Sequence, residues 1–247
     1  MDRREAVLRE LNLYPQWVRR NKPGSVTADA GAKSPASATV ATPIQPAAEE
    51  SPAGPTRTGS LDWNKLKQQV HDCKACKLRA GCTQTVFGVG DEKADWLFVG
   101  EGPGADEDVL GEPFVGQAGK LLDNMLMAIK LRRGNNVYIA NIVKCRPPGN
   151  RNPEAEEIAT CLPYLQRQIE LIQPKIIVAL GKVASNALLG RDATLASLRG
   201  KLHDYRAGAS IPLIVTYHPA YLLRSPSEKA KAWQDLKLAV KTLDRKI

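Results

Sequence analysis

The feature that most constrains the fold is an alternation of short apolar runs with longer amphipathic patterns, which begins at Asp95. The apolar runs predict four buried strands, at residues 96–99, 137–140, 175–180 and 212–216. Patterns with helical spacing lie at residues 117–130, 153–172, 184–189 and 227–243. Strands that alternate with helices form a mainly parallel sheet whose two faces are covered. We therefore expect a three-layer α/β/α fold with a central four-stranded, mainly parallel sheet.

Composition divides the chain into three parts. Between residues 21 and 60, 29 of 40 residues are Ala, Pro, Gly, Ser or Thr, and none is aromatic. Such a segment buries too little apolar surface to offset its chain entropy, so we expect a disordered linker. The linker separates an amphipathic segment at residues 1–20 from a domain at residues 61–247, which is large enough to hold a substantial core.

Hydropathy and charge narrow the function. The chain has no apolar run of about 18 residues that could span a membrane, and its first residues are charged where a signal peptide would be apolar. We therefore expect a cytoplasmic protein without a membrane partner. The formal net charge is +9, and most of it falls on residues 61–247. This excess favours a polyanionic partner, nucleic acid first, although a solvated basic surface would give the same count.

The cysteines carry the firmest spacing signal. Cys73 and Cys76 form a CxxC pair, Cys145 follows the second predicted strand, and Cys161 lies in the next helix. Two pairs from separate segments predict a four-thiolate site, for which zinc and a [4Fe–4S] cluster are both candidates. A redox pair and buried structural cysteines are the alternatives. We expect Cys82 not to be a ligand.

Polar residues follow three of the predicted strands, where parallel α/β sheets bind ligands. The first strand leads into GEGPGADED at residues 100–108, a glycine-rich turn without the GxGxxG spacing of a dinucleotide site. Asn141 follows the second strand and can both donate and accept, as reading the edge of a base requires. His218 follows the fourth strand, and Phe114 is an aromatic residue that could stack on a flat ligand.

In this order the motifs resemble the family 4 uracil-DNA glycosylases, the iron–sulfur members of the uracil-DNA glycosylase superfamily. The segments that carry the resemblance are CxxC at 73–76, TVFG at 85–88, GEGPGxxED at 100–108, GEPFVGQAGKLL at 111–122, NIVKCRPP at 141–148, Cys161 and HPAYLLR at 218–224. They span about residues 63–243. The resemblance implies the fold of that superfamily and a DNA repair enzyme that flips uracil out of single- or double-stranded DNA. It would hydrolyse the glycosidic bond and leave an abasic site, acting as a monomer.

The resemblance also implies roles for individual residues. A [4Fe–4S] cluster, rather than zinc, would be held by Cys73, Cys76, Cys145 and Cys161. Phe114 would stack on uracil, Asn141 would read its pairing edge, and His218 would donate to the O2 oxygen as negative charge builds there. Glu101 and Glu107 are the candidates for positioning water or shaping the pocket, whereas Gly102 stands where the best-known branch of the superfamily has an aspartate. Toward DNA, the implied residues are Leu222 and Leu223 as an apolar wedge and Arg224 as a phosphate contact.

Two other functions would use some of the same sequence features. A non-catalytic or product-trapping nucleic-acid-binding module could use the same fold, but the trapping branch has GEQPG and an inserted basic loop, and this chain has neither. A dinucleotide-dependent enzyme is disfavoured by the glycine spacing.

Residues 1–20 loosely resemble the N-terminus of the clamp-loader psi subunit, which predicts a tether to the replication machinery. The alternative is a short helix folded back on the core.

Overall fold

The computed structural model describes residues 58–206 and 210–244. The expectations for residues 1–20 and for nearly all of the linker at 21–60 lie outside these ranges. The described part begins at Thr58, whose hydroxyl donates to the carbonyl of Pro163 at 3.3 Å, so Thr58 is attached to the folded domain three residues before the expected boundary. No helix in the described ranges is long and apolar enough to cross a bilayer.

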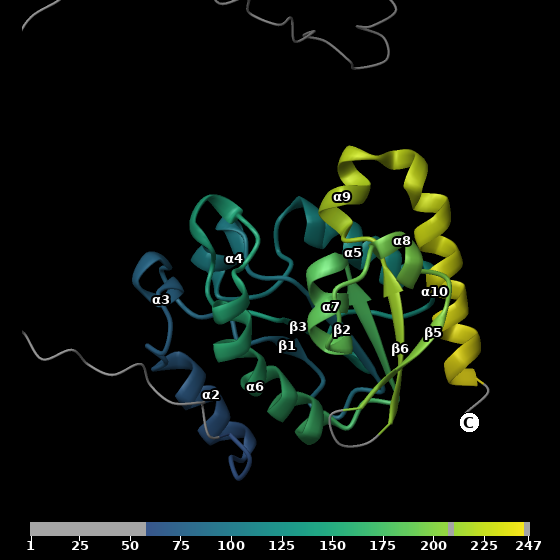
Figure 1. The fold of residues 1–247 in the computed structure, drawn as a ribbon. Coiled ribbons are helices and arrows are strands. Elements are labelled where there is room, and N and C mark those ends of the chain that lie inside the picture. The colour runs from purple at the N-terminus through teal and green to yellow at the C-terminus, as the bar shows by residue number, and fades with distance from the viewer. Residues whose placement is uncertain (1–57, 207–209, 245–247) are drawn as a thin grey trace, which may run out of the picture. The chain divides into compact units, whose positions relative to one another are not determined.

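Within these residues the domain is built on a six-stranded sheet with the order β1-β3-β2-β4-β6-β5 (Figure 1). The strands are β1 Val89–Gly90, β2 Trp96–Gly100, β3 Val137–Asn141, β4 Ile176–Leu180, β5 Leu202–Tyr205 and β6 Ile211–Thr216. The four predicted strands β3, β2, β4 and β6 run parallel at the centre. The expected number of strands is wrong, because β1 and β5 pair antiparallel at the two edges.

Helices cover both faces of the sheet. They are α2 Trp63–His71, α3 Leu78–Gly81, α4 Ala105–Leu110, α5 Gln117–Ala128, α6 Ala155–Ile172, α7 Lys182–Leu189, α8 Leu195–Leu198, α9 Pro219–Arg224 and α10 Lys229–Asp244, with short 3₁₀ turns at Pro148–Asn150 and Pro226–Glu228. α6 begins two residues later than its pattern predicts. The backbone N–H of Glu154 donates to the Glu157 carboxylate at 2.7 Å, and this bond caps the N-terminus of the helix.

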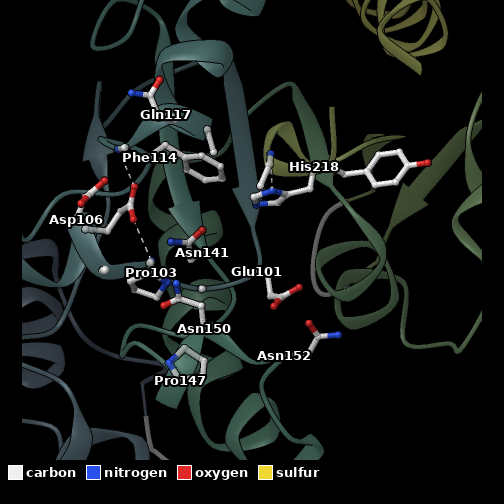
Figure 2. A pocket seen from close by; sticks show the side chains of 18 of the residues that line it. Glu101, Pro103, Asp106, Phe114, Gln117, Asn141, Pro147, Asn150, Asn152 and His218 are labelled. Atoms are coloured by element: carbon white, nitrogen blue, oxygen red, sulfur yellow. Dashed lines mark hydrogen bonds between the residues drawn. The ribbon is translucent and has the colours of Figure 1, made fainter. Parts of the chain in front are cut away.

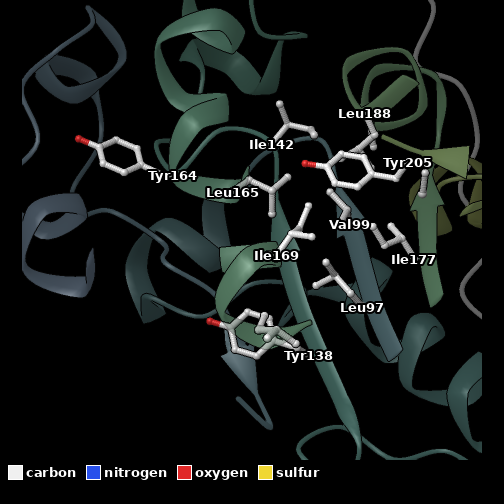
Figure 3. Packing of buried hydrophobic residues seen from close by; sticks show 14 of the residues in the cluster. Leu97, Val99, Tyr138, Ile142, Tyr164, Leu165, Ile169, Ile177, Leu188 and Tyr205 are labelled. Atoms are coloured by element: carbon white, nitrogen blue, oxygen red, sulfur yellow. The ribbon is translucent and has the colours of Figure 1, made fainter. Parts of the chain in front are cut away.

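Alternate residues along each central strand enter two separate cores. Leu97 and Val99 of β2 face α2, α6 and α7, where they pack with Leu165 and Ile169 (Figure 3). The intervening Phe98 points to the opposite face, which is covered by α5 and α10. Strands buried on both faces are apolar throughout, and this is why the four central runs are conspicuous in the sequence. The predicted α/β/α layering is confirmed, and the carboxyl ends of the parallel strands are left open for a site.

Candidate active site

A cavity of about 500 Å³ opens at the carboxyl ends of β2, β3 and β6 (Figure 2). Four of the predicted residues that line it come from separate parts of the chain. Glu101 follows β2, Asn141 ends β3, Phe114 lies between α4 and α5, and His218 precedes α9. Gly102, Glu107 and Arg224 also line the cavity. The fold therefore brings together residues that the sequence separates by more than a hundred positions.

Phe114 is held in an unfavourable backbone conformation by contacts on both sides of its loop. Its φ is 57°, in the left-handed region that bulky residues avoid. The Arg133 guanidinium donates to the carbonyls of Pro113 at 2.8 Å and of Phe114 at 2.7 Å, and its Nε donates to Asp123 at 3.1 Å. On the other side, the Glu107 carboxylate accepts from the two backbone N–H groups that follow Phe114. We call Arg133 and Glu107 the loop clamp.

The acidic residues of the glycine-rich motif have distinct partners. One oxygen of Glu107 accepts from the N–H groups of Val115 at 2.9 Å and Gly116 at 3.0 Å, and the other accepts from that of Gly104 at 3.0 Å. Asp108 is buried and accepts from the backbone N–H and hydroxyl of Thr83 at 2.9 and 3.0 Å. These two carboxylates organise loops, so the shaping role fits Glu107 better than the positioning of water.

Asn141 presents a buried acceptor that has no partner in the described part of the chain. The residue is 2% exposed, and its Oδ1 lacks a hydrogen bond there. Its backbone is held from behind, because the Lys144 Nζ donates to the Asn141 carbonyl at 3.0 Å and to Gln168 Oε1 at 2.7 Å. A buried amide oxygen without a donor is costly unless a ligand supplies one.

His218 is placed as a neutral hydrogen-bond donor. It caps the N-terminus of α9, where its Nδ1 accepts from the backbone N–H of Ala220 at 3.2 Å. The proton of the neutral ring therefore sits on Nε2. Burial, together with the positive charge of Arg224, lowers the pKa of His218 from 6.5 to about 4, so the ring is uncharged at neutral pH. Its centroid lies 5.4 Å from that of Phe114 (Figure 2).

Glu101 is the half-buried acid of the cavity. Burial raises its pKa above the usual value for glutamate, which makes the carboxylate a better proton acceptor at neutral pH. Figure 2 shows its side chain in the cavity near Asn152. The neighbouring Gly102 has no room for a side chain, since a Cβ there would lie 2.8 Å from Val143 Cγ2. An aspartate at this position would require Val143 to move.

The three residues expected to contact DNA differ in their exposure to solvent. Leu222 is 1% exposed and packs inside the domain, so the wedge role expected for it does not fit its position. Leu223 is 43% exposed, and Arg224 lines the cavity. The cavity is also lined by Tyr221 and the loop Asn150–Asn152, to which the sequence motifs assign no role. The polar run that follows Pro147 and Pro148 was the available signal for the loop, but no spacing rule singles it out.

The four cysteines predicted as ligands line one small cavity of about 10 Å³ between α2, α3 and α6. Among the described residues, no group of three or more His, Cys, Asp or Glu side chains is arranged as a metal site. The donor set nevertheless suits a thiolate-bound centre. The backbone N–H of Lys144 donates to Cys161 Sγ at 3.2 Å, as occurs around cluster sulfurs. Cys82 does not line the cavity, although it hydrogen-bonds to the Cys145 thiol.

Comparison with known proteins identifies the family. A family model for the uracil DNA glycosylase superfamily matches residues 87–237, so the chain belongs to this superfamily. It is 45% identical to the type-4 uracil-DNA glycosylase of Archaeoglobus fulgidus, over 72% of this chain and 90% of that protein. The type-4 enzymes of Pyrobaculum aerophilum (71% of this chain, 92% of that protein) and Thermotoga maritima (67% and 85%) are each 44% identical to it. Within the superfamily, the chain is a member of the type-4 branch.

Proposed function

We propose that this protein is a DNA repair enzyme that hydrolyses the bond between uracil and deoxyribose in DNA and leaves an abasic site. The observation that carries the proposal is the buried Oδ1 of Asn141, which has no hydrogen-bond partner within residues 58–206 and 210–244 and shares its cavity with Phe114 and the neutral donor His218. A base inside a duplex cannot reach such a cavity, so uracil must be flipped out at a cost of a few kcal/mol.

Base selection follows from the direction of the Asn141 hydrogen bonds. The Oδ1 accepts the N3–H of uracil, while the side-chain N–H of Asn141 donates to the uracil O4. Cytosine has no proton on N3, and it presents an amino group in place of O4. It would therefore leave the buried Oδ1 unpaired and set two donors against each other. Phe114 stacks on the ring face and excludes water from these bonds.

The reaction breaks the C1′–N1 bond, and the electron pair passes to uracil, where charge accumulates on N1 and O2. The Nε2–H of His218 donates to O2 and stabilises this charge; one such donor is worth roughly 3–4 kcal/mol. The oxygen of a water molecule then bonds to C1′. Glu101 orients this water and accepts its proton, because the carboxylate of Glu107 is already occupied by three backbone N–H groups. The uracil anion takes a proton on release.

We also propose that Cys73, Cys76, Cys145 and Cys161 hold a [4Fe–4S] cluster. When bound, the cluster supplies structural cross-linking, since thiolate ligands would join the loop between α2 and α3 to the segment after β3 and to α6. This role is supported by the common cavity that the four thiols line and by the Lys144 N–H directed at Cys161. The residues that act on uracil come from the neighbouring cavity.

Three further expectations complete the proposal. The enzyme acts as a monomer in the cytoplasm on uracil in single- or double-stranded DNA, and the excess positive charge of the chain contributes to phosphate binding. Residues 61–247 form the catalytic domain, and residues 1–20, on the linker at 21–60, tether it to a replication or clamp-loader protein. Pull-down of that partner by the full chain, with loss on deletion of residues 1–20, tests the tether. Equal capture by both would contradict it.

The activity is tested with labelled oligonucleotides that contain one uracil, treated with alkali after incubation to cleave abasic sites. The purified, cluster-loaded protein should yield cleaved product from uracil and none from cytosine. His218→Ala and Asn141→Ala should lose most of this activity and keep the visible absorbance of the cluster. Absence of product from the folded wild-type protein would reject the proposed function. Equal loss of activity and absorbance in the variants would show that the two residues support folding instead.

A further inference from the structure

The exposed aromatic ring at the rim of the cavity is Tyr221, which the proposed function leaves without a role. It lies in the first turns of α9, three residues after His218. Its side chain lines the cavity and the residue is 37% exposed. The next residue, Leu222, is buried, and the exposed Leu223 is not part of the cavity lining. Tyr221 is therefore the aromatic side chain of α9 that reaches both the cavity and solvent.

A column of packed groups supports this ring from inside the domain. The Tyr221 ring stacks on that of Tyr217, with centroids 5.0 Å apart and an angle of 28° between the planes. The guanidinium of Arg199 lies 4.2 Å from the centroid of the Tyr217 ring. We call Asp235, Arg199, Tyr217 and Tyr221 the aromatic column. It extends from the covered face of α10 to the cavity rim.

The inner end of the column is fixed by a buried ion pair. The Arg199 Nε and Nη2 donate to Asp235 Oδ2 at 2.8 and 2.7 Å, and the Asp235 side chain is 1% exposed. The backbone N–H of Gly200 donates to the other oxygen of Asp235 at 3.2 Å. The Tyr217 hydroxyl is hydrogen-bonded to Glu228. Tyr217 cannot turn away without losing its contacts with Arg199 and Glu228, so it supports the ring of Tyr221 before any ligand arrives.

We propose that Tyr221 is a stacking platform for the nucleobase next to the flipped uracil. This inference rests on the proposed function. A base that leaves the stack deprives its neighbours of a stacking partner, and a flat ring at the rim of the receiving cavity replaces it. Such stacking tolerates any sequence, because every base has a π face. The nearby Arg224, which lines the cavity, suits an adjoining phosphate.

The platform predicts a dependence on strandedness. In a duplex, the opposite strand holds the neighbouring base in position, whereas in a single strand the protein alone must order it. Loss of the Tyr221 ring should therefore raise KM on single-stranded substrate about 10- to 100-fold, and less on duplex. Tyr221→Phe should remain within about twofold of wild type, because it keeps the ring.

The kinetic test compares uracil release by wild type, Tyr221→Ala, Tyr221→Phe and Tyr221→Leu on both substrates. Trp233→Ala is the matched control, since Trp233 is 40% exposed on α10 and lies outside the cavity lining. The leucine variant distinguishes a stacking platform from an apolar wedge, because leucine is apolar and bulky but has no flat ring. It should behave as the alanine variant does, and activity equal to wild type would overturn the platform. Tyr217→Ala, which removes the support and keeps Tyr221, should raise KM in the same direction.

A spectroscopic test detects the stack itself. The probe is an oligonucleotide with 2-aminopurine beside 2′-fluoro-2′-deoxyuridine, which resists hydrolysis. Binding of wild type or Tyr221→Phe should quench the fluorescence of 2-aminopurine, whereas binding of Tyr221→Ala should not. Uracil release by wild type together with unchanged KM and quenching in Tyr221→Ala would overturn the platform alone. Absence of uracil release by wild type would reject the proposed function and the platform with it.

Discussion

The loop clamp gives a prediction whose size follows from the structure. Arg133 does not line the cavity, yet it donates to the carbonyls of Pro113 and Phe114. Substitution Arg133→Ala removes both hydrogen bonds and leaves the residues that contact uracil intact. We expect Phe114 to relax out of its left-handed conformation, so that the stacking ring is no longer ready to receive the base.

The magnitude follows from two opposing terms. Each hydrogen bond from the charged guanidinium contributes roughly 1.5–3 kcal/mol. The left-handed backbone of Phe114 costs about 1–3 kcal/mol, so the wild-type clamp outweighs the strain. Without Arg133 the relaxed loop is favoured by the strain that it releases. If this strain is about 2 kcal/mol, only a few per cent of molecules keep the Phe114 ring in its stacking position. The apparent affinity falls to that fraction of its wild-type value, which means a rise in KM of about 10- to 30-fold with little change in kcat. The lower value of this range allows for the hydrogen bonds of Glu107, which still hold the other side of the loop.

Steady-state uracil release at several substrate concentrations measures this split. Arg133→Lys should be intermediate, because one ammonium can reach one carbonyl, and added guanidinium ion should partly restore the alanine variant. Thermal unfolding checks that the domain is intact. A KM within twofold of wild type in a folded Arg133→Ala protein would refute the clamp, and so would a fall in kcat at unchanged KM.

Three further predictions concern protons and the cluster. Because the pKa of His218 is about 4 when folded and near 6.5 when unfolded, the unfolded chain gains a proton first on acidification. Stability should fall by about 1.4 kcal/mol per pH unit between those values, and thermal unfolding of His218→Gln should lack this loss. Glu101→Gln should lower kcat roughly 100-fold at unchanged KM, and an unaltered single-turnover rate would contradict its role. Cys161→Ser should lose the visible absorbance and bound iron, whereas Cys82→Ser should keep both; iron loss in both would make Cys82 a ligand.

The parts of the sheet that the sequence reveals are those that are buried on both faces. Residues 96–99 and 176–180 are apolar without interruption, because helices cover them on either side. β1 has two residues, one of them a glycine with φ of 135°, and offers no periodicity to detect. β5 reads Leu-His-Asp-Tyr and is mostly solvent-facing, so its residues look like a loop. Edge strands of this kind are fixed by their neighbours rather than by their own sequence.

The candidate site likewise contains residues that the sequence predicts and residues that it does not. Glu101, Asn141 and His218 follow from one rule, that ligands lie beyond the carboxyl ends of parallel strands. Their convergence on one cavity in the structure supports this. The burial of Leu222 could not be foreseen, because it depends on how α9 packs against α5. The role of Arg133 was equally hidden, since its partners are main-chain carbonyls that no side-chain pattern identifies.

The close packing around Phe114 has an evolutionary consequence. A Cβ on Gly100 would lie 2.5 Å from the Phe114 ring, and a Cβ on Gly119 would overlap the Phe114 carbonyl. Neither glycine can gain a side chain while the phenyl ring and its loop keep their positions. These three positions should therefore vary as a set among relatives. A smaller residue in place of the ring would not by itself release Gly100, because a Cβ there would still lie 2.5 Å from Asn141 Oδ1. A lineage that changed Gly100 would therefore have to alter the stacking ring and the base-reading amide together.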